Sequence, residues 1–199
     1  MQSSKRRSNR DRSETTRAEL VAAARKLFVE RGYAETGTPD IVTAAGMTRG
    51  ALYHHFADKQ ALFRAVAEAE AKAVADEIEK AAPPSLFARD ALLAGGEAYL
   101  AAMAEPGRTR LLLLDGPAVL GRAGMDEIDD RHGNRTLREG LAAAMRAGEM
   151  PKLPLDALTA QLGALFDRAA LAIDGGADIT QHRTVLAAVI DGLMRPAAR

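Results

Sequence analysis

Apolar residues recur at intervals of three or four positions along most of this 199-residue chain. This spacing forms one face of an α-helix, whereas the alternation of apolar and polar residues that indicates a half-buried strand is almost absent. Proline and glycine interrupt the pattern where helices would end, at Pro83-Pro84, Pro106-Gly107, Gly116-Pro117 and Pro151. We therefore predict an all-α protein.

The first 60 residues combine a basic segment with the start of a helical domain. Residues 1–14 are polar and basic and lack apolar periodicity, so we expect a flexible arm there. Thr16 and Glu19 have the spacing of a capping box, which predicts that the first helix starts at this point. Gly32 suits the position just after the end of that helix.

Residues 38–56, TPDIVTAAGMTRGALYHHF, predict two short helices joined by a glycine turn. Thr38 is a good N-cap with Pro39 at the first helical position, Gly46 turns the chain, and Thr48 caps the second helix. Five apolar side chains are expected to face inward: Ile41, Val42 and Ala45 from the first of these helices, and Leu52 and Phe56 from the second. A fourth, long helix is expected to follow, from Asp58 to Ala82.

The region after residue 84 is expected to form a second helical block. One helix is predicted over about 85–104, and the apolar run Leu111–Leu114 should be broken by Gly116-Pro117. In the helical region over about 125–147, Ile128 and Leu137 fall on opposite faces of a continuous helix. That helix is therefore either buried on two sides or broken near Gly133.

The last two predicted helices carry the most regular apolar spacing in the chain. Over 155–173, leucines and other apolar residues recur every three or four positions, with small residues between them. A similar pattern covers 185–193. Such a pair can pack closely against a copy of itself. We expect a homodimer interface from these residues: Leu158, Leu162, Leu165, Phe166, Ala169, Leu186, Val189, Ile190 and Leu193.

Charge is unevenly distributed although the formal net charge is +0. Residues 1–60 hold 11 Lys+Arg against 7 Asp+Glu, a difference of +4 that the remainder balances. This asymmetry indicates an anionic partner at one end of the chain. Cys is 0, and no apolar run approaches the roughly 20 residues that span a bilayer, so we expect a cytoplasmic protein without membrane contact.

The second helix of the glycine-linked pair has the chemistry of a DNA-recognition helix. Arg49 lies at its N-terminal end and can donate two hydrogen bonds to guanine, while Gly50 and Ala51 permit close approach. The free backbone N–H groups at the N-terminal end of a helix also favour binding of a phosphate group. The predicted DNA contacts are Thr38, Thr48, Arg49, Gly50, Ala51, Tyr53, His54 and Lys59. Because such helix pairs are common in all-α proteins, ordinary packing with a solvated Tyr53-His54-His55 face remains the alternative.

The stretch from Gly32 to Phe63, GYAETGTPDIVTAAGMTRGALYHHFADKQALF, resembles the N-terminal signature of TetR-type transcriptional regulators. The resemblance covers roughly Thr16 to Ala65, with Val42 where the family usually has Ala and Met47-Thr48 in place of Val-Ser. It implies a helix-turn-helix domain, a C-terminal domain that dimerises through its last two helices, and often a small-molecule pocket. The organisation expected is an arm at 1–14, a DNA-binding domain at 15–60 and a regulatory and dimerisation domain at 61–199.

Apolar and polar residues of the C-terminal block are candidates for a pocket that binds an unidentified small-molecule effector. They are Tyr99, Met103, Leu111, Leu114, Asp115, Arg131 and Phe166; an ordinary filled core is the alternative. The charged segment from Glu127 to His132 fits a solvated helix face better than a ligand site. The resemblance implies that an effector moves the fourth helix. We therefore expect a repressor that the effector releases from a near-palindromic operator.

No catalytic constellation is recognisable in the sequence. The 4 histidines lack metal-binding spacing, and neither a phosphate-binding GxxxxGK[ST] loop nor a GxSxG nucleophile motif occurs. We therefore expect no enzymatic activity, no cofactor and no metal. The alternative to a regulator is a dimeric helical ligand-binding or scaffold protein without sequence-specific operator binding, which loss of the cationic and small residues of the recognition helix would favour.

Overall fold

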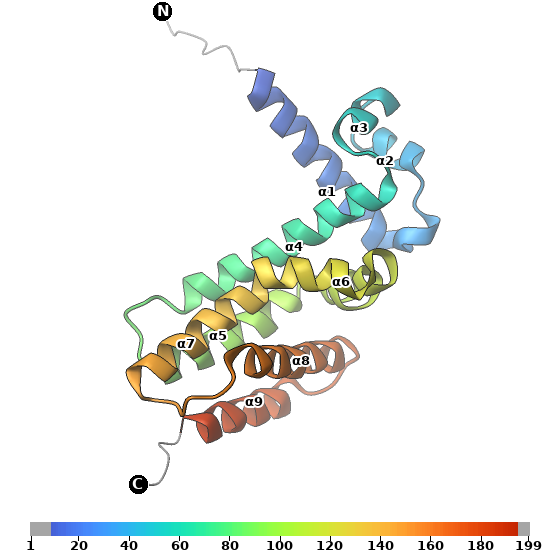
Figure 1. The fold of residues 1–199 in the computed structure, drawn as a ribbon. Helices are drawn as coiled ribbons and strands as arrows, with labels where there is room; N and C mark the ends of the chain where they lie inside the picture. The colour runs from blue at the N-terminus through green and yellow to red at the C-terminus, as the bar shows by residue number, and fades with distance from the viewer. Residues whose placement is uncertain (1–8, 195–199) are drawn as a thin grey trace, which may run out of the picture. The chain divides into compact units, whose positions relative to one another are not determined.

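The computed structural model describes residues 9–194, and its regular structure within that range is helical. Figure 1 shows the arrangement of the elements along the chain. They are α1 (Asn9–Glu35), α2 (Thr38–Ala44), α3 (Arg49–His55), α4 (Lys59–Ala81), α5 (Ala88–Met103), the π-helical turn η1 (Arg110–Asp115), α6 (Gly116–Arg131), α7 (Gly133–Ala147), α8 (Leu155–Asp174) and α9 (Ile179–Leu193). The all-α prediction is confirmed.

The chain divides into two compact units, Met1–Ala67 and Glu68–Arg199. Helix α4 supplies residues to both, because it begins in the first unit and ends in the second. The boundary expected between residues 60 and 61 also falls within this helix. Each unit has its own buried apolar side chains and is described by itself.

An aromatic cluster organises the core of the N-terminal unit. The rings of Phe28 and Phe63 lie 5.3 Å apart, and Tyr33 packs edge-on against Phe63 at 5.2 Å. Ile41 and Leu52, which were expected to face inward, are fully buried. Burial of these side chains fixes α2 and α3 against the rest of the unit, so that the opposite face of α3 is left to solvent.

Most of the capping residues predicted for this unit are found at the helix ends. Thr48 and Asp58 act as expected, since their side-chain oxygens accept hydrogen bonds from the backbone N–H groups of Ala51 and Ala61. Gly32 has a φ of 82° and interrupts α1 where a stop was predicted. Gly37, not Thr38, occupies the N-cap of α2.

The predicted start of the first helix was wrong. Helix α1 already begins at Asn9, so Thr16 lies within it and residues 9–14 are helical and not a flexible arm. Arg10 and Glu14 form an i,i+4 ion pair on its first turns, which supports helix in a polar segment. Residues 1–8 of the expected arm lie outside the described range.

In the C-terminal unit, α5 packs against α7, α8 and α9. The chain does not break at Gly116-Pro117, because η1 continues directly into α6 and the turn comes later, at Gly121 with a φ of 74°. Of the two alternatives for the 125–147 region, the structure shows the break near Gly133, since His132 has non-helical angles between α6 and α7. This break allows Ile128 and Leu137 to belong to different helices.

Candidate nucleic-acid interface and internal cavity

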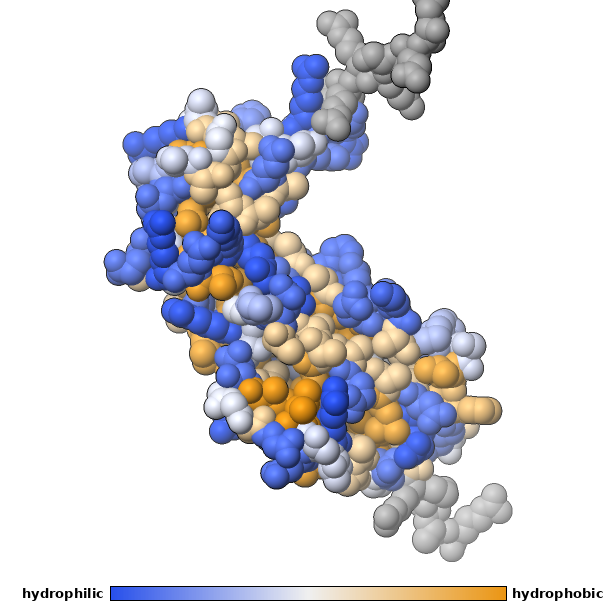
Figure 2. Space-filling view, turned by 180° about the vertical axis from the view of Figure 1, so that it is seen from behind, coloured by the Kyte–Doolittle hydropathy of each residue, from blue (hydrophilic) through white to orange (hydrophobic). Residues whose placement is uncertain are grey.

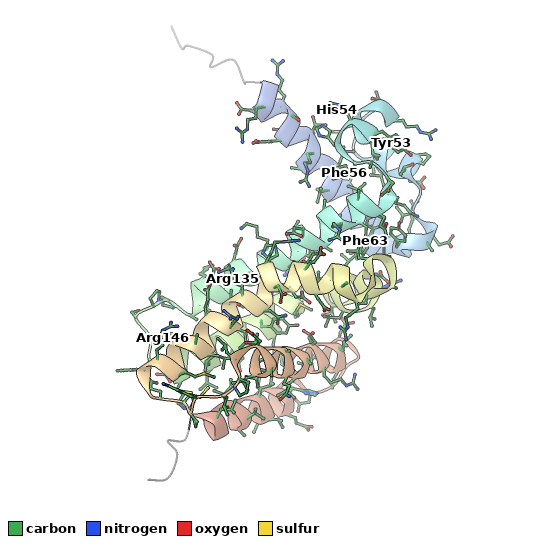
Figure 3. All side chains as sticks on the ribbon, in the orientation of Figure 1. Tyr53, His54, Phe56, Phe63, Arg135 and Arg146 are labelled. Carbon is green, nitrogen blue, oxygen red and sulfur yellow. The ribbon has the colours of Figure 1, made fainter. Side chains whose placement is uncertain are left out.

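Helix α3 presents a polar, cationic face to solvent. Tyr53 is 42% exposed, and the Arg49 guanidinium lies over its ring at 5.4 Å. The hydroxyls of Tyr53 and Thr38 are 3.4 Å apart, which links the exposed sides of α2 and α3. Figure 3 shows Tyr53 and His54 on this helix, while Phe56 and Phe63 lie at positions of the buried core.

The Tyr53 phenol is surrounded by hydrogen-bond donors. Its hydrogen bond to Thr38, followed by that to Arg49, lowers the pKa of the Tyr53 phenol. An anionic ligand such as a phosphate would meet Arg49 and two hydroxyl donors on this face.

Gly50 has no packing reason to lack a side chain. A Cβ atom built at this position would find its nearest neighbour, the Thr48 hydroxyl, 3.9 Å away. Glycine within a helix costs about 1 kcal/mol relative to alanine. Since nothing inside the protein requires that cost, the absent side chain leaves room for something outside it.

His54 and Lys59, which are also predicted to contact DNA, have intramolecular partners as well. The rings of His54 and His55 pack edge-on at 5.2 Å. The Lys59 ammonium donates to the backbone carbonyls of Tyr33 at 2.9 Å and Thr36 at 3.1 Å, and so satisfies the C-terminal end of α1. This structural role of Lys59 was not predicted, and its contact with DNA stays a prediction.

The C-terminal unit encloses a cavity of about 720 Å³. Of the predicted pocket residues, Tyr99, Met103 and Phe166 line it. Gly96 explains how Phe166 reaches this position, because a Cβ atom at residue 96 would lie 2.9 Å from its ring. The cavity is thus bounded by side chains from several helices, with an absent side chain on α5 making room for an aromatic wall.

Four predicted pocket residues do not line the cavity: Leu111, Leu114, Asp115 and Arg131. The π-helical turn changes the register of the leucine run, so Leu112 and Leu113 border the cavity while Leu114 is 52% exposed. Asp115 instead pairs with Arg110, and Arg131 pairs with Glu68. Those four assignments were wrong.

A polar corner of the cavity was missed by the sequence analysis. The Tyr99 hydroxyl on α5 donates to the Asp167 carboxylate on α8 at 2.6 Å, and Asp129 on α6 also lines the space. Burial, followed by the charge of Asp167, raises the pKa of Asp129 to about 7, and burial raises that of Asp167. The aspartates at 129 and 167 are far apart in sequence, and no spacing pattern connects them.

Fewer of the predicted dimer residues on α8 and α9 are exposed than was expected from the sequence. Five of the nine expected dimer residues are buried within the protomer: Leu162, Phe166, Ala169, Leu186 and Ile190. Leu158, Leu165, Val189 and Leu193 remain partly exposed, and Val185 is 56% exposed. Figure 2 shows hydrophobic patches on one face of the C-terminal unit, separated by hydrophilic side chains.

Within residues 9–194, no helix is long and apolar enough to cross a membrane. Within the same range, no group of three His, Cys, Asp or Glu side chains is placed to hold a metal ion.

Comparisons with known proteins agree with this geometry in both units. Residues 20–66 match the bacterial regulatory proteins of the tetR family, and residues 89–197 match the tetracyclin repressor-like C-terminal domain. The HTH-type transcriptional repressor AcnR of Corynebacterium efficiens is 36% identical over 70 residues, 35% of this chain and 37% of its own length. The HTH-type transcriptional activator FasR of Mycolicibacterium smegmatis is 33% identical over 94 residues, 47% of this chain and 43% of its own length. These matches therefore span less than half of the curated relatives.

Solved structures extend the likeness to nearly the whole chain. A TetR-family transcriptional regulator from Pectobacterium atrosepticum is 31% identical with a TM-score of 0.73, covering 96% of this chain and all of the other. A regulator from Pseudomonas aeruginosa PAO1, 21% identical with a TM-score of 0.76 and covering 91% of each chain, shares the fold. The C-terminal domain match alone covers more than half of the sequence. This chain belongs to the TetR family.

Proposed function

We propose that this protein is a homodimeric transcriptional repressor that binds a near-palindromic DNA operator and is released from it by a small-molecule effector. The observation that carries the proposal is the exposed face of α3, with Arg49, Tyr53 and the unfilled space at Gly50. The repressors among the relatives support repression over activation, although an activator also matches.

On DNA, α3 acts as the recognition helix. Arg49 near its N-terminal end reaches base edges, while Thr38, Tyr53 and His54 contact phosphates and set the register. In a symmetric dimer, two copies of α3 enter successive major grooves about 34–36 Å apart, which requires an operator with matching half-sites. The basic balance of the first 60 residues adds affinity through counterion release.

The effector binds the cavity of the C-terminal unit. Its wall includes Val74 and Ile78 of α4, the helix that also supplies residues to the N-terminal unit. An effector that prefers the arrangement unable to bind DNA shifts the population toward it, and one with equal affinity for both arrangements shifts nothing. Contact with α4 gives the cavity ligand a direct way to exert that preference.

The decisive experiment measures binding of the purified protein to its own upstream DNA and to scrambled DNA by fluorescence anisotropy across a salt series. We expect tight, steeply salt-dependent binding that prefers the upstream sequence. R49A should weaken it by about 1–3 kcal/mol on the cognate site and much less on scrambled DNA. R146A, which removes an exposed arginine of the C-terminal unit, is the control and should bind like wild type.

Each contrary result has a defined meaning. An equal loss on both DNAs would show that Arg49 contacts phosphate only. Weak and equal binding of the wild-type protein to upstream, scrambled and pooled genomic fragments would reject operator binding and favour a helical ligand-binding or scaffold protein.

A further inference from the structure

We infer that the cavity of the C-terminal unit binds an organic cation, with its apolar body against the helices and its positive charge at Asp129 and Asp167. This inference deepens the proposed function, on which it rests for the role of the cavity as effector site. The cavity, its apolar wall and its polar corner each contribute an independent constraint on the ligand.

The size and the wall of the cavity define the body of the ligand. A volume of about 720 Å³ lies within the range of sites that hold small organic molecules. Apolar side chains from α4, α5, η1 and α8 border it: Val74, Ile78, Leu92, Leu112, Leu162 and Phe166. A strongly hydrated ligand would leave these surfaces without a partner, so the body of the ligand is apolar.

The polar corner defines the charge. The Asp167 carboxylate accepts the Tyr99 hydroxyl, but the side chain of Asp129 has no hydrogen bond or ion pair among the described residues. Asp129 is half-buried, and among the described residues the distant charge of Arg122 is the only one that favours its ionised form. A desolvated carboxylate without a hydrogen-bonded partner is costly, and a bound cation would supply that partner. Tyr99 and Phe166, whose ring centroids lie 5.8 Å apart, add aromatic faces that also attract cations.

The charged side chains that line the cavity are mostly acidic. The lining carries six acids and one base, namely Glu79 on α4, Asp126 and Asp129 with Arg122 on α6, Glu139 on α7, Glu149 after it, and Asp167 on α8. Glu79 and Glu139 are already paired with Arg135. An anionic ligand would face the two aspartates with only the exposed Arg122 as a counter-charge, so the geometry disfavours it.

Protonation supports the assignment. Burial raises the pKa of Asp129 to about 7, so this carboxyl is partly protonated near neutrality. A cation beside it would lower that pKa and release a proton on binding. Affinity for a permanent cation should therefore rise between pH 6 and pH 8, whereas affinity for a neutral ligand of the same shape should not.

Three probes with one flexible decyl chain separate shape from charge: decyltrimethylammonium, 1-decanol and decyl sulfate. We would titrate each, below its micelle concentration, into the full-length protein by calorimetry at pH 8. The ammonium should bind at least tenfold more tightly than the alcohol, and the sulfate most weakly. In D129N/D167N, the preference for the ammonium should fall at least tenfold while binding of the alcohol persists.

The matched control is D156N/D174N, which removes the same charge from α8 residues outside the cavity and should keep the preference. Persistent alcohol binding shows that the cavity of the aspartate variant is intact. Equal affinities for the three probes, a preference for decyl sulfate, or an unchanged preference in D129N/D167N would overturn the inference. Failure of the proposed function would appear separately, as cation binding that leaves DNA affinity unchanged or as absent operator binding.

Discussion

Two single residues of this protein have no evident role in its internal packing. Gly50 lacks a side chain on α3 although space is available for one, and Asp129 places a carboxyl without a hydrogen-bonded partner in the polar corner of the cavity. Each feature lowers the stability of the folded chain, and under the proposed function each is retained for binding. A substitution that improves stability and impairs binding at these positions would demonstrate the conflict directly.

Replacing Gly50 by alanine separates the two effects. The added methyl group meets nothing closer than 3.9 Å, so G50A should fold normally and gain up to about 1 kcal/mol of unfolding free energy. On DNA, the methyl group occupies the space through which the backbone approaches, so operator affinity should fall at least tenfold. Thermal unfolding and anisotropy on the same preparation test both parts. Operator binding like that of wild type would show that Gly50 is not at the interface.

Asp129 should make the free energy of unfolding fall as pH rises. Because the folded pKa is raised to about 7, the folded state holds a proton that the unfolded state releases near pH 4. Between these values the unfolded state binds fewer protons, so stability falls as pH rises, by at most about 1.4 kcal/mol per pH unit. D129N has no such group and should be the more stable protein at pH 8, with the advantage shrinking toward pH 5.

Denaturant unfolding of wild type and D129N at pH 5, 6.5 and 8 measures this difference. D174N, which removes an exposed carboxylate from the end of α8, is the control and should follow wild type at each pH. Parallel curves for wild type and D129N would mean that the carboxyl at residue 129 ionises normally in the folded protein.

At the scale of elements, Glu68 connects α4 to the end of the helix that carries Asp129. Its carboxylate accepts hydrogen bonds from Arg131 at 2.8 Å and lies 3.0 Å from the His132 ring nitrogen. The hydrogen bond from Arg131 is the main reason why the pKa of Glu68 is lowered. The C-terminal end of α6 is therefore held against α4 two residues beyond a cavity-lining side chain, an arrangement suited to transmit ligand binding.

The variant E68A should weaken the coupling between effector and DNA more than it weakens either binding event. Partly exposed ion pairs contribute about 1 kcal/mol or less, so the fold should persist. The factor by which a cavity ligand reduces operator affinity should drop by about fivefold or more. E77A, which removes an exposed glutamate of α4 that pairs loosely with Lys80 at 3.9 Å, is the control. Undiminished coupling in E68A would exclude this contact as the route.

Helix periodicity predicted which segments are helical but not which faces meet. The pattern of Ile41, Leu52 and Phe56 was sufficient for the N-terminal unit, because those short helices have one buried face each. In α8 the same spacing placed Leu162 and Phe166 at a dimer surface, although the structure buries both inside the protomer. A helix that is apolar on two sides does not reveal from sequence which side packs internally.

The cavity was less predictable than the helix-turn-helix pair because its residues converge only in three dimensions. The π-helical turn at Arg110–Asp115 changes which leucines face inward, and no propensity signals it in a run of four identical residues. Tyr99 and Asp167 meet across 68 positions of sequence. The predicted DNA-contact residues, in contrast, lie within one local motif whose capping and turn residues fix their geometry.

At the scale of the whole molecule, the proposed recognition of two DNA half-sites requires a dimer. The exposed apolar positions of α9 are where dimerisation can be tested. Val185 is 56% exposed, and Val189 lies one turn further along the same helix face. A charge at residue 185 would remain solvated in a monomer but be desolvated in a dimer interface. The variant V185D should therefore be folded but largely monomeric at micromolar concentration.

Light scattering and DNA anisotropy on V185D should change together. Loss of the second recognition helix removes half of the contacts, so affinity for the full operator should fall at least a hundredfold, toward the value for an isolated half-site. T184D places the same charge at the adjacent exposed position, on a different side of α9, and should remain dimeric with near-normal affinity. A dimeric V185D with normal operator binding would place the interface elsewhere, and a dimeric V185D with weak binding would show that α9 influences DNA without holding the subunits together.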